Sequence, residues 1–210
     1  MEKKKLSCAD CAVGNCDWER GKFPGFCMTT HMDGAVKKVA MSEYEKEEIF
    51  RVMKCAAETE YEGYGTLTRV QETIEFAKKM QVKKIGIATC VGLLRETNAL
   101  AKVLRKHGFE VVGIACKAGT VPKVEIGIDA QCAEIGPNMC NPVLQAKLLN
   151  EEKTDLNIIM GLCVGHDSLF VKYSDALVTT LVTKDRVMGH NPVAVLYQLE
   201  SYYSKLMEEE

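Results

Sequence analysis

The sequence predicts an α/β protein with a small, doubly wound, mostly parallel sheet and helices on both faces. From about residue 82 onward, short apolar runs alternate with helical patterns, as in parallel strands that are joined by helices. The apolar runs are continuous, which is typical of strands that are buried on both faces. Two of these runs end in the same tripeptide, Cys-Val-Gly, which begins at Cys90 and at Cys163.

We divide the chain into three parts. Residues 1–34 form a cysteine-rich, turn-rich head with little regular structure. Residues 35–81 form a helical bridge with apolar side chains at helical spacing. Residues 82–210 form the α/β domain, which carries a cluster of cysteines at one edge of its sheet.

Local sequence signals place the individual elements. The first bridge helix is expected to begin near Ser42, because Ser42-x-x-Glu45 has the pattern of a capping box. Asn141-Pro142 and Asn191-Pro192 combine an N-cap asparagine with a proline in the first helical position, so helices are expected to begin there. The expected strands are 83–89, 109–116, 155–162 and 175–183; the other expected helices are 66–80, 93–106 and 166–172, and the last helix runs from 192 to about 206.

Composition excludes several classes of partner. The net charge is only -2 and the basic residues form no single block, so nucleic acid is not expected. The segment Met1–Lys5 is basic but has no apolar core after it, so we predict no signal peptide, no membrane partner and a cytoplasmic location. Ten cysteines in such a chain stay reduced and more often bind metal than form disulfides.

Four of these cysteines follow or adjoin the predicted strand ends: Cys90, Cys116, Cys140 and Cys163. The carboxyl ends of parallel strands meet at one edge of a sheet, where ligands bind in open α/β folds. We therefore expect these four thiols to converge as ligands of a [4Fe–4S] cluster or a tetrahedral zinc ion. The alternative is that they are small apolar residues of the core without a metal.

Two features favour the iron–sulfur cluster over zinc at this edge. Lys117, Lys184 and Arg186 follow strands and would offset the negative charge of bound thiolates. Helices that follow Cys90, Cys140 and Cys163 would also direct their amino ends toward the site. Structural zinc sites usually include a close Cys-x2-Cys pair, which is absent here.

The two halves of the α/β domain resemble each other in order. A strand, Cys-Val-Gly, a helix, a second strand and an Asn-Pro-Val helix start occur in each half, so Cys140 corresponds to His190 and Cys116 to Thr183. The connecting segments differ in length, and both true pseudo-symmetry and coincidence remain open.

The head contains a second candidate metal site formed by Cys8, Cys11, Cys16 and Cys27. Cys-x2-Cys is a common metal-binding spacing, and both zinc and iron–sulfur fit it. We favour a second [4Fe–4S] cluster, because it would provide an electron path to the sheet-edge site, and keep zinc as the alternative. A bound metal would also supply folding energy that such a short segment lacks.

Several charged side chains are candidates for catalysis. His166 opens a predicted helix and would protonate a molecule bound at the cluster. His190 would bind metal or hydrogen-bond to a substrate, or it is a loop residue without a role. Lys184 and Arg186 would hold an anionic substrate, the alternative for the segment 184–186 being a solvated charged turn. Lys117 is a further candidate. Cys55, inside a helix, and Cys132, in a loop, are each expected to be a core or surface thiol, with metal ligation as the alternative.

Several motifs resemble those of a known family. They are Cys8-Ala-Asp-Cys11 with Cys16 and Cys27, Met139-Cys-Asn-Pro142, Gly161-Leu-Cys-Val-Gly-His-Asp167 and Lys184-Asp-Arg-Val-Met-Gly-His-Asn-Pro192. They resemble the uncharacterised prokaryotic metal-binding proteins of domain-of-unknown-function family 1847. The resemblance implies metal binding in a bacterial or archaeal, anaerobic setting, and it implies no particular reaction.

Three functions remain open from the sequence. The first is a redox protein in which the head cluster passes electrons to the sheet-edge cluster, with a partner protein or a small molecule as reactant. The second is a non-redox enzyme in which Cys90, Cys116 and Cys140 hold a cluster whose free iron acts as a Lewis acid or accepts sulfur. The third is a zinc-stabilised binding or sensor module. The sequence predicts no oligomeric state.

Overall fold

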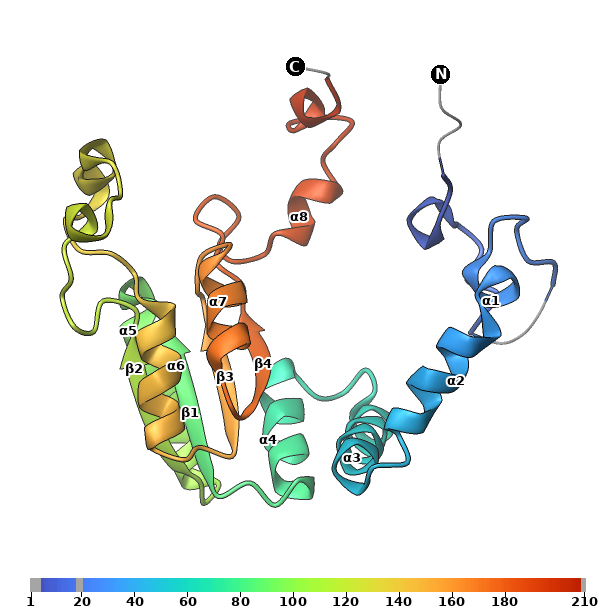
Figure 1. The fold of residues 1–210 in the computed structure, drawn as a ribbon, viewed down its shortest axis with the longest axis horizontal. Helices are drawn as coiled ribbons and strands as arrows, with labels where there is room; N and C mark the ends of the chain where they lie inside the picture. The colour runs from blue at the N-terminus through green and yellow to red at the C-terminus, as the bar shows by residue number, and fades with distance from the viewer. Residues whose placement is uncertain (1–4, 18–20, 209–210) are drawn as a thin grey trace. The chain divides into compact units, whose positions relative to one another are not determined.

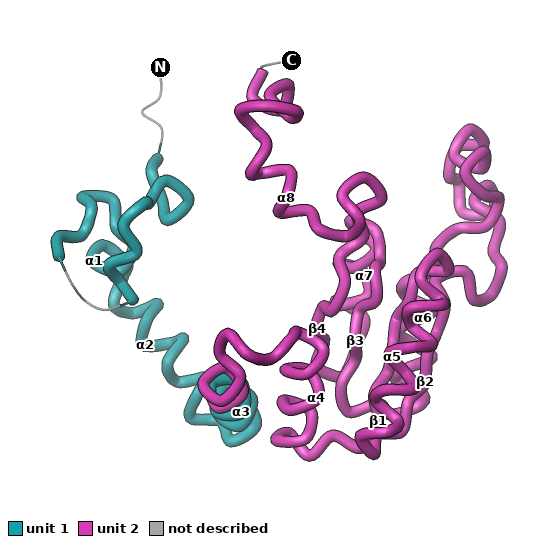
Figure 2. The backbone as a smooth tube through the Cα atoms, turned by 180° about the vertical axis from the view of Figure 1, so that it is seen from behind, with its two compact units in different colours: residues 1–57 teal, residues 58–210 magenta. Residues whose placement is uncertain are grey.

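The computed structural model describes residues 5–17 and 21–208. The chain divides into two compact units, Met1–Ala57 and Glu58–Glu210 (Figure 2). The predicted head at 1–34 lies within the first unit, although its residues 1–4 and 18–20 are outside the described part. The basic start of the chain and the end of its acidic tail, 209–210, are also outside it. No described helix is both long and apolar enough to cross a bilayer.

The first unit consists of short helices. They are η1 (Cys8–Asp10), α1 (Met28–His31), α2 (Gly34–Glu43) and α3 (Glu47–Gly63), and the boundary to the second unit falls within α3. The predicted helix start at Ser42 is wrong. The helix α2 begins after Asp33, whose carboxylate accepts a hydrogen bond from the backbone of Ala35 at 2.8 Å. Ser42 lies inside α2, and its hydroxyl donates to the carbonyl of Val39 instead.

The second unit contains a four-stranded, all-parallel sheet, which confirms the predicted fold class (Figure 1). Its strands are β1 (Lys84–Thr89), β2 (Glu110–Ala115), β3 (Leu156–Met160) and β4 (Leu177–Val182), in the spatial order β2-β1-β3-β4. The central strands β1 and β3 are almost entirely buried, which explains why the sequence shows them as continuous apolar runs.

Helices cover both faces of this sheet. On one face, α4 (Arg69–Lys79) and α5 (Leu94–Lys106) pack against Ile85, Ile87 and Ile158. On the other face, α6 (Pro142–Glu151) and α7 (His166–Tyr173) contribute Leu149 and Phe170 to a second apolar cluster. Figure 1 shows α6 and α7 in front of the strands. Two separate apolar layers of this kind define a doubly wound sheet.

The strand order creates a topological switch point between β1 and β3. The chain leaves β1 toward β2 on one side and continues from β2 to β3 on the other side. In open α/β sheets, ligands commonly bind outside the carboxyl ends of the strands at such a point. Cys90 directly follows β1, and Cys163 follows β3 by three residues.

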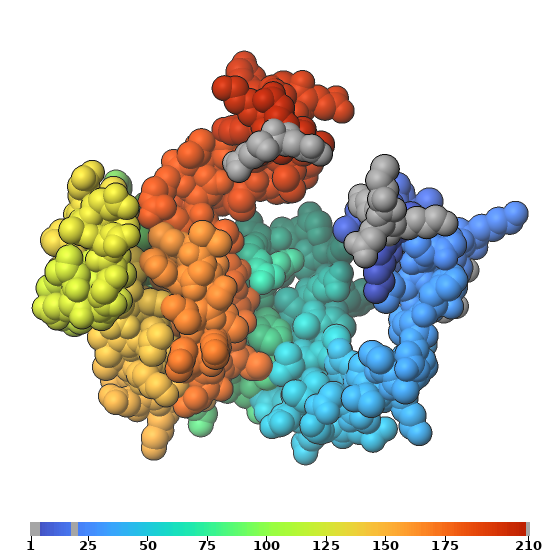
Figure 3. All heavy atoms as spheres, turned by 45° about the horizontal axis from the view of Figure 1, so that its top comes forward, coloured from blue at the N-terminus to red at the C-terminus, as the bar shows by residue number. Residues whose placement is uncertain are grey.

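Two segments extend from this carboxyl edge (Figures 1 and 3). The first, between β2 and α6, contains η3 (Lys123–Ile126) and η4 (Ala130–Ile135). The second follows β4, and here the predicted helix from 192 to 206 is wrong. The chain forms only α8 (Val193–Leu196), turns, and η5 (Ser204–Met207). Tyr197 and Tyr202 are 78% and 90% exposed, so this segment lacks the packing that stabilises most helices.

Candidate metal centre at the carboxyl edge of the sheet

Backbone hydrogen bonds place three of the predicted cysteines at the end of the sheet. The amide of Cys90 donates to Met160 at 3.1 Å, and that of Cys116 donates to Thr89 at 2.8 Å. These bonds extend the strand pairing to the cysteines themselves. The amide of Asn141 donates to the carbonyl of Cys116 at 2.7 Å, so the returning loop sets Cys140 beside Cys116.

Cys90, Cys116 and Cys140 belong to the apolar cluster on the α6 and α7 face. Their sulfurs also receive backbone hydrogen bonds at the crevice. The amide of Val91 donates to Cys116 Sγ and the amide of Gly92 donates to Cys90 Sγ, both at 3.4 Å. Hydrogen bonds of this kind stabilise thiolates and tune the reduction potential of iron–sulfur clusters.

Cys116 and Cys140 are hydrogen-bonded to each other. The hydrogen bond from the Cys116 thiol, together with Lys117 and His166, lowers the pKa of Cys140 to about 5, against the opposing effect of burial. The same bond and burial raise the pKa of Cys116 above its usual value. Near neutral pH, Cys140 is therefore the thiolate and Cys116 the thiol that donates to it.

Cys163 is held by a different partner. The guanidinium of Arg186 donates from Nη2 to Cys163 Sγ at 3.1 Å. This bond and the negative charge of Cys163 raise the pKa of Arg186, and Cys90 and Cys140 contribute in the same direction. Arg186 therefore lies within electrostatic reach of three of the four predicted sheet-edge thiols.

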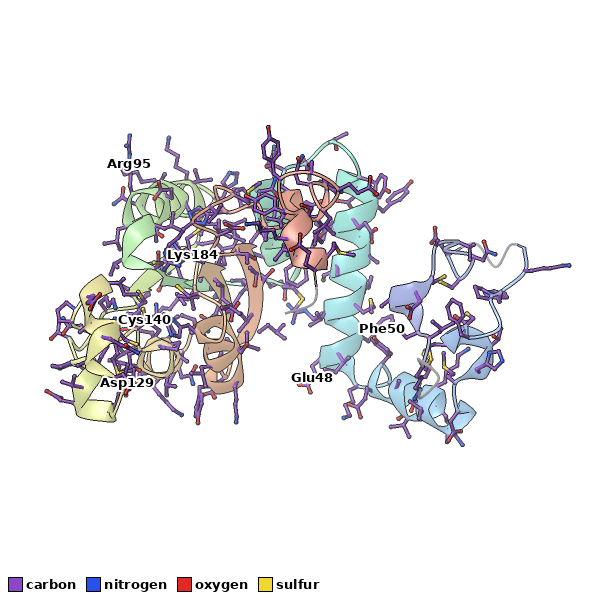
Figure 4. All side chains as sticks on the ribbon, turned by 90° about the horizontal axis from the view of Figure 1, so that it is seen from above. Glu48, Phe50, Arg95, Asp129, Cys140 and Lys184 are labelled. Carbon is purple, nitrogen blue, oxygen red and sulfur yellow. The ribbon has the colours of Figure 1, made fainter. Side chains whose placement is uncertain are left out.

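Two lysines complete the site. The ammonium of Lys117 donates to the carbonyl of Asn138 and to Cys140. Lys184 lies next to two glycines at the switch point: its Nζ is 3.9 Å from where a Cβ on Gly92 would stand, and its Cε is 3.6 Å from the corresponding position on Gly161. Figure 4 shows Cys140 and Lys184 at this end of the sheet.

The predicted histidines have different surroundings. His166 is the first residue of α7 and lies within electrostatic reach of Cys140. His190 has a positive φ of 69° and accepts a hydrogen bond on Nδ1 from the amide of Asp185 at 3.1 Å. Its own amide donates back to the carbonyl of Asp185 at 2.9 Å. These two hydrogen bonds between His190 and Asp185 close the turn after β4.

The thiols at this edge are not joined by disulfides, and none of the ten cysteines forms one. Cys116 interacts with both Cys140 and Cys90, and Arg186 lies close to Cys163, Cys90 and Cys140. Within residues 5–17 and 21–208, no three His, Cys, Asp or Glu side chains form a group that could hold a metal ion. Cysteine thiolates are ligands of both zinc and iron–sulfur clusters, so the residue types suit either centre, whereas the arrangement described here is not that of a metal site.

The four head cysteines are placed less closely. The amide of Cys11 donates to the carbonyl of Cys8 at 3.2 Å, so these two residues lie at the ends of one short turn. Cys8, Cys11 and Cys16 are exposed. Burial would raise the pKa of Cys27, but hydrogen bonds from Thr29 and Thr30 outweigh it and leave that pKa lowered. Within the part of the head that the structure describes, no three His, Cys, Asp or Glu side chains form a group that could hold a metal ion.

The remaining thiols lie elsewhere in the chain. Cys55 is buried in α3, as expected for a core thiol, and Cys132 is exposed in η4.

Sequence reasoning missed Gln145. It lies on α6 and is fully buried, and its amide donates to the carbonyls of Thr89 at 3.1 Å and Ile114 at 2.6 Å. Thr89 directly precedes Cys90 and Ile114 lies two residues before Cys116, so Gln145 ties together the two strand ends that carry these cysteines. The sequence did contain a signal for this role: Gln145 is a polar residue on the buried side of the first turns of α6, which are otherwise apolar.

Two comparisons relate the chain to known proteins. A family model described as "Protein of unknown function (DUF1847)" matches residues 27–181. An uncharacterised protein of Methanocaldococcus jannaschii is 46% identical over 168 residues, which cover 80% of this chain and 86% of that protein. The matched family region includes all four sheet-edge cysteines and begins at Cys27, after the first three head cysteines.

Proposed function

The chain belongs to the family described as protein of unknown function DUF1847, and from its own residues we propose that it is an iron–sulfur protein that reduces a small molecule. Cys90, Cys116, Cys140 and Cys163 would hold a [4Fe–4S] cluster at the carboxyl edge of the sheet. The single observation that supports this most strongly is the interaction of Cys116 with Cys90 and Cys140, together with the position of Arg186 close to Cys163, Cys90 and Cys140. Three of these cysteines follow strand ends, and Cys140 lies in the loop before α6.

Each neighbouring group has a role in this proposal. Lys117 and Arg186 stabilise thiolates at Cys140 and Cys163, with which they already interact. The amides of Val91 and Gly92 donate to two of the sulfurs and keep them oriented. When bound, the cluster would supply one-electron reduction. His166, near Cys140, would donate the proton that such a reduction requires.

We further propose that Cys8, Cys11, Cys16 and Cys27 hold a second [4Fe–4S] cluster that receives electrons from a partner protein. The turn that joins Cys8 and Cys11 supports metal binding in the head. Zinc in the head is the alternative. Ten cysteines without a disulfide fit a reducing compartment, so we propose a cytoplasmic location.

One observation favours a second function. Cys90, Cys116 and Cys140 interact with one another, whereas Cys163 is hydrogen-bonded to Arg186 at 3.1 Å. A cluster held by the first three cysteines alone would leave one iron open. Cys163 and Arg186 would then face the bound substrate, and the protein would be a non-redox enzyme with Lewis-acid or sulfur-accepting chemistry.

Anaerobic purification followed by metal analysis and electron paramagnetic resonance tests these proposals. About eight irons per chain is expected for two clusters. If the head contains zinc and the sheet edge contains iron, the proposal of a second cluster in the head is wrong and the proposal for the sheet edge stands. Zinc without iron, or a colourless preparation free of both metals, would rule out the main proposal and the second function alike.

Cysteine variants separate the two functions. Cys163→Ser is expected to remove the sheet-edge signal if Cys163 is a ligand, and to preserve a perturbed signal if the cluster has three cysteine ligands. Cys140→Ser should remove the signal in both cases. Cys132→Ser is the matched control, because Cys132 is exposed and lies in η4. If Cys140→Ser leaves the signal intact, the proposed ligand set is wrong.

A further inference from the structure

Three permanent cations lie at the carboxyl edge, and their partners differ. Lys117 is engaged with Cys140 and Asn138, and Arg186 is engaged with Cys163. Lys184 is only partly exposed, and its ammonium has no hydrogen-bond or ion-pair partner within residues 5–17 and 21–208.

The nearby carboxylates do not neutralise Lys184. Asp185 accepts hydrogen bonds on Oδ1 from the amides of Val187 at 2.9 Å and Met188 at 2.8 Å, within its own turn. Asp167 accepts a hydrogen bond from the amide of Ser168 at 2.8 Å. Both acidic side chains therefore bind the backbone of their own segments.

The space beside Lys184 is kept open by a glycine. A Cβ on Gly92 would stand 3.8 Å from Cys90 Sγ and 3.9 Å from Lys184 Nζ. The missing side chain thus leaves a gap between a candidate ligand sulfur and an unpaired ammonium. Gly92 has no positive φ, so its backbone conformation does not by itself require glycine.

Charge counting indicates what this gap would accept. A [4Fe–4S] core in its common oxidised state carries one net negative charge with three thiolates and two with four. Lys117 and Arg186 already interact with Cys140 and Cys163. Lys184 forms no ion pair within residues 5–17 and 21–208, so its ammonium is the group at this edge that is suited to an oxyanion such as a carboxylate or a phosphate.

We propose that Lys184, beside Gly92, anchors the oxyanion group of a small anionic substrate next to the sheet-edge cluster. This inference rests on the proposed function and specifies its substrate class. The site lies at the switch point between β1 and β3, where ligands commonly bind in open α/β sheets. Arg186, whose side chain is exposed, is the second group that can reach such an anion.

Calorimetric titration of the anaerobically purified protein with two probe anions, inorganic phosphate and succinate, tests this inference. Succinamide serves as the neutral control for succinate. We expect at least one anion to bind and the amide not to bind. Lys184→Gln should weaken binding at least about tenfold, as for loss of a charge-assisted hydrogen bond. Lys172→Gln, which removes an exposed lysine of α7, should leave the affinity unchanged.

Lys184→Gln could also weaken anion binding by losing the cluster, so a second variant separates the two effects. Gly92→Ala adds one methyl group at ordinary contact distance from Cys90 and Lys184, and should weaken anion binding while the iron content stays the same. Equal affinities of the wild type, Lys184→Gln and Gly92→Ala would overturn the inference and leave Lys184 as a counter-charge for the cluster. An iron-containing protein that binds neither anion would also overturn it, with the proposed function intact. An iron-free protein would overturn both.

Discussion

Asn141 donates its backbone N–H to the carbonyl of Cys116 at 2.7 Å, and this bond closes a loop of 24 intervening residues onto the end of β2. The side chain of Asn141 also accepts a hydrogen bond from the amide of Leu144 at 2.9 Å, which caps α6. One residue thus fixes both the start of a helix and the position of Cys140 beside Cys116.

Replacing Asn141 by alanine should therefore lower stability and loosen the thiol pair. Loss of an N-cap side chain typically costs about 0.5–2 kcal/mol, measured as the change in free energy of unfolding in urea. Thr68→Ala, which removes the N-cap of α4 away from the thiols, is the matched control. Only Asn141→Ala should also reduce the iron content of the protein. Equal iron retention in both variants would contradict the positioning role.

The Cys116–Cys140 pair predicts selective alkylation of the metal-free protein. The pKa of Cys140 is lowered to about 5, so its thiolate is present at pH 6 and is lost only as the pH falls through that value. We expect iodoacetamide to modify Cys140 faster than the exposed Cys132 at pH 6, as followed by peptide mass spectrometry. In Cys116→Ala this advantage should diminish, because the stabilising hydrogen bond is gone. Equal modification rates of Cys140 and Cys132 in the wild-type protein would contradict the hydrogen bond between Cys116 and Cys140.

Gly86 in β1 predicts a large packing penalty on substitution. A Cβ at this position would lie 2.1 Å from Asn157 Oδ1, and Asn157 is held in place by hydrogen bonds with Thr154 and Ser174, both at 2.8 Å. Gly86→Ala should lower the free energy of unfolding by about 1–3 kcal/mol or prevent folding.

Gly113→Ala in β2 is the control for this substitution, because the nearest atom to its Cβ is 3.9 Å away. We expect it to change the stability by much less. Similar losses of stability in the two variants would show that the packing of Gly86 against Asn157 is not the cause.

Metal removal should disorder the backbone of the head more than that of the sheet. The elements η1 and α1 have three and four residues, too few to be stable alone, so a bound metal would supply most of their order. After chelation, hydrogen exchange should accelerate for the amides of residues 5–17 and 21–34. The amides of β1 and β3 should stay protected, because these strands are buried by apolar packing. Unchanged exchange in the head would argue against a metal there.

The sequence was sufficient for the elements that depend on local patterns. The four strands were placed within a few residues, because burial on both faces produces continuous apolar runs. The helix α6 begins at Pro142 as expected, because its N-cap and first position are set by Asn141 and the proline ring. The same signal at Asn191-Pro192 was wrong in both respects: Pro192, not Asn191, is the N-cap of α8, without a side-chain cap hydrogen bond, and the helix ends at Leu196. Most helices also need a surface to pack against, which a local cap signal does not provide.

At the candidate site, too, some features follow from local sequence patterns and others depend on tertiary contacts. Cys90, Cys116 and Cys163 follow strands that end at the carboxyl edge, so their place at this edge was predictable from the sequence. Cys140 reaches the edge through the loop before α6, which the Asn141–Cys116 backbone hydrogen bond holds there. The correspondence of His190 with Cys140 was suggested by motif order alone, and His190 instead closes the turn through Asp185. The sequence halves therefore share a strand-and-helix plan, while this pair of residues has different contacts.

The amino-acid sequence by itself determined the parallel α/β fold and the edge of the sheet at which the thiols collect, because apolar periodicity and chain order control both. Only the tertiary structure decided that Cys116 pairs with Cys140, that Arg186 holds Cys163, and that Lys184 has no partner in the described chain. These relationships depend on distances of a few ångströms between segments that are far apart in sequence, and local preference carries no information about such distances.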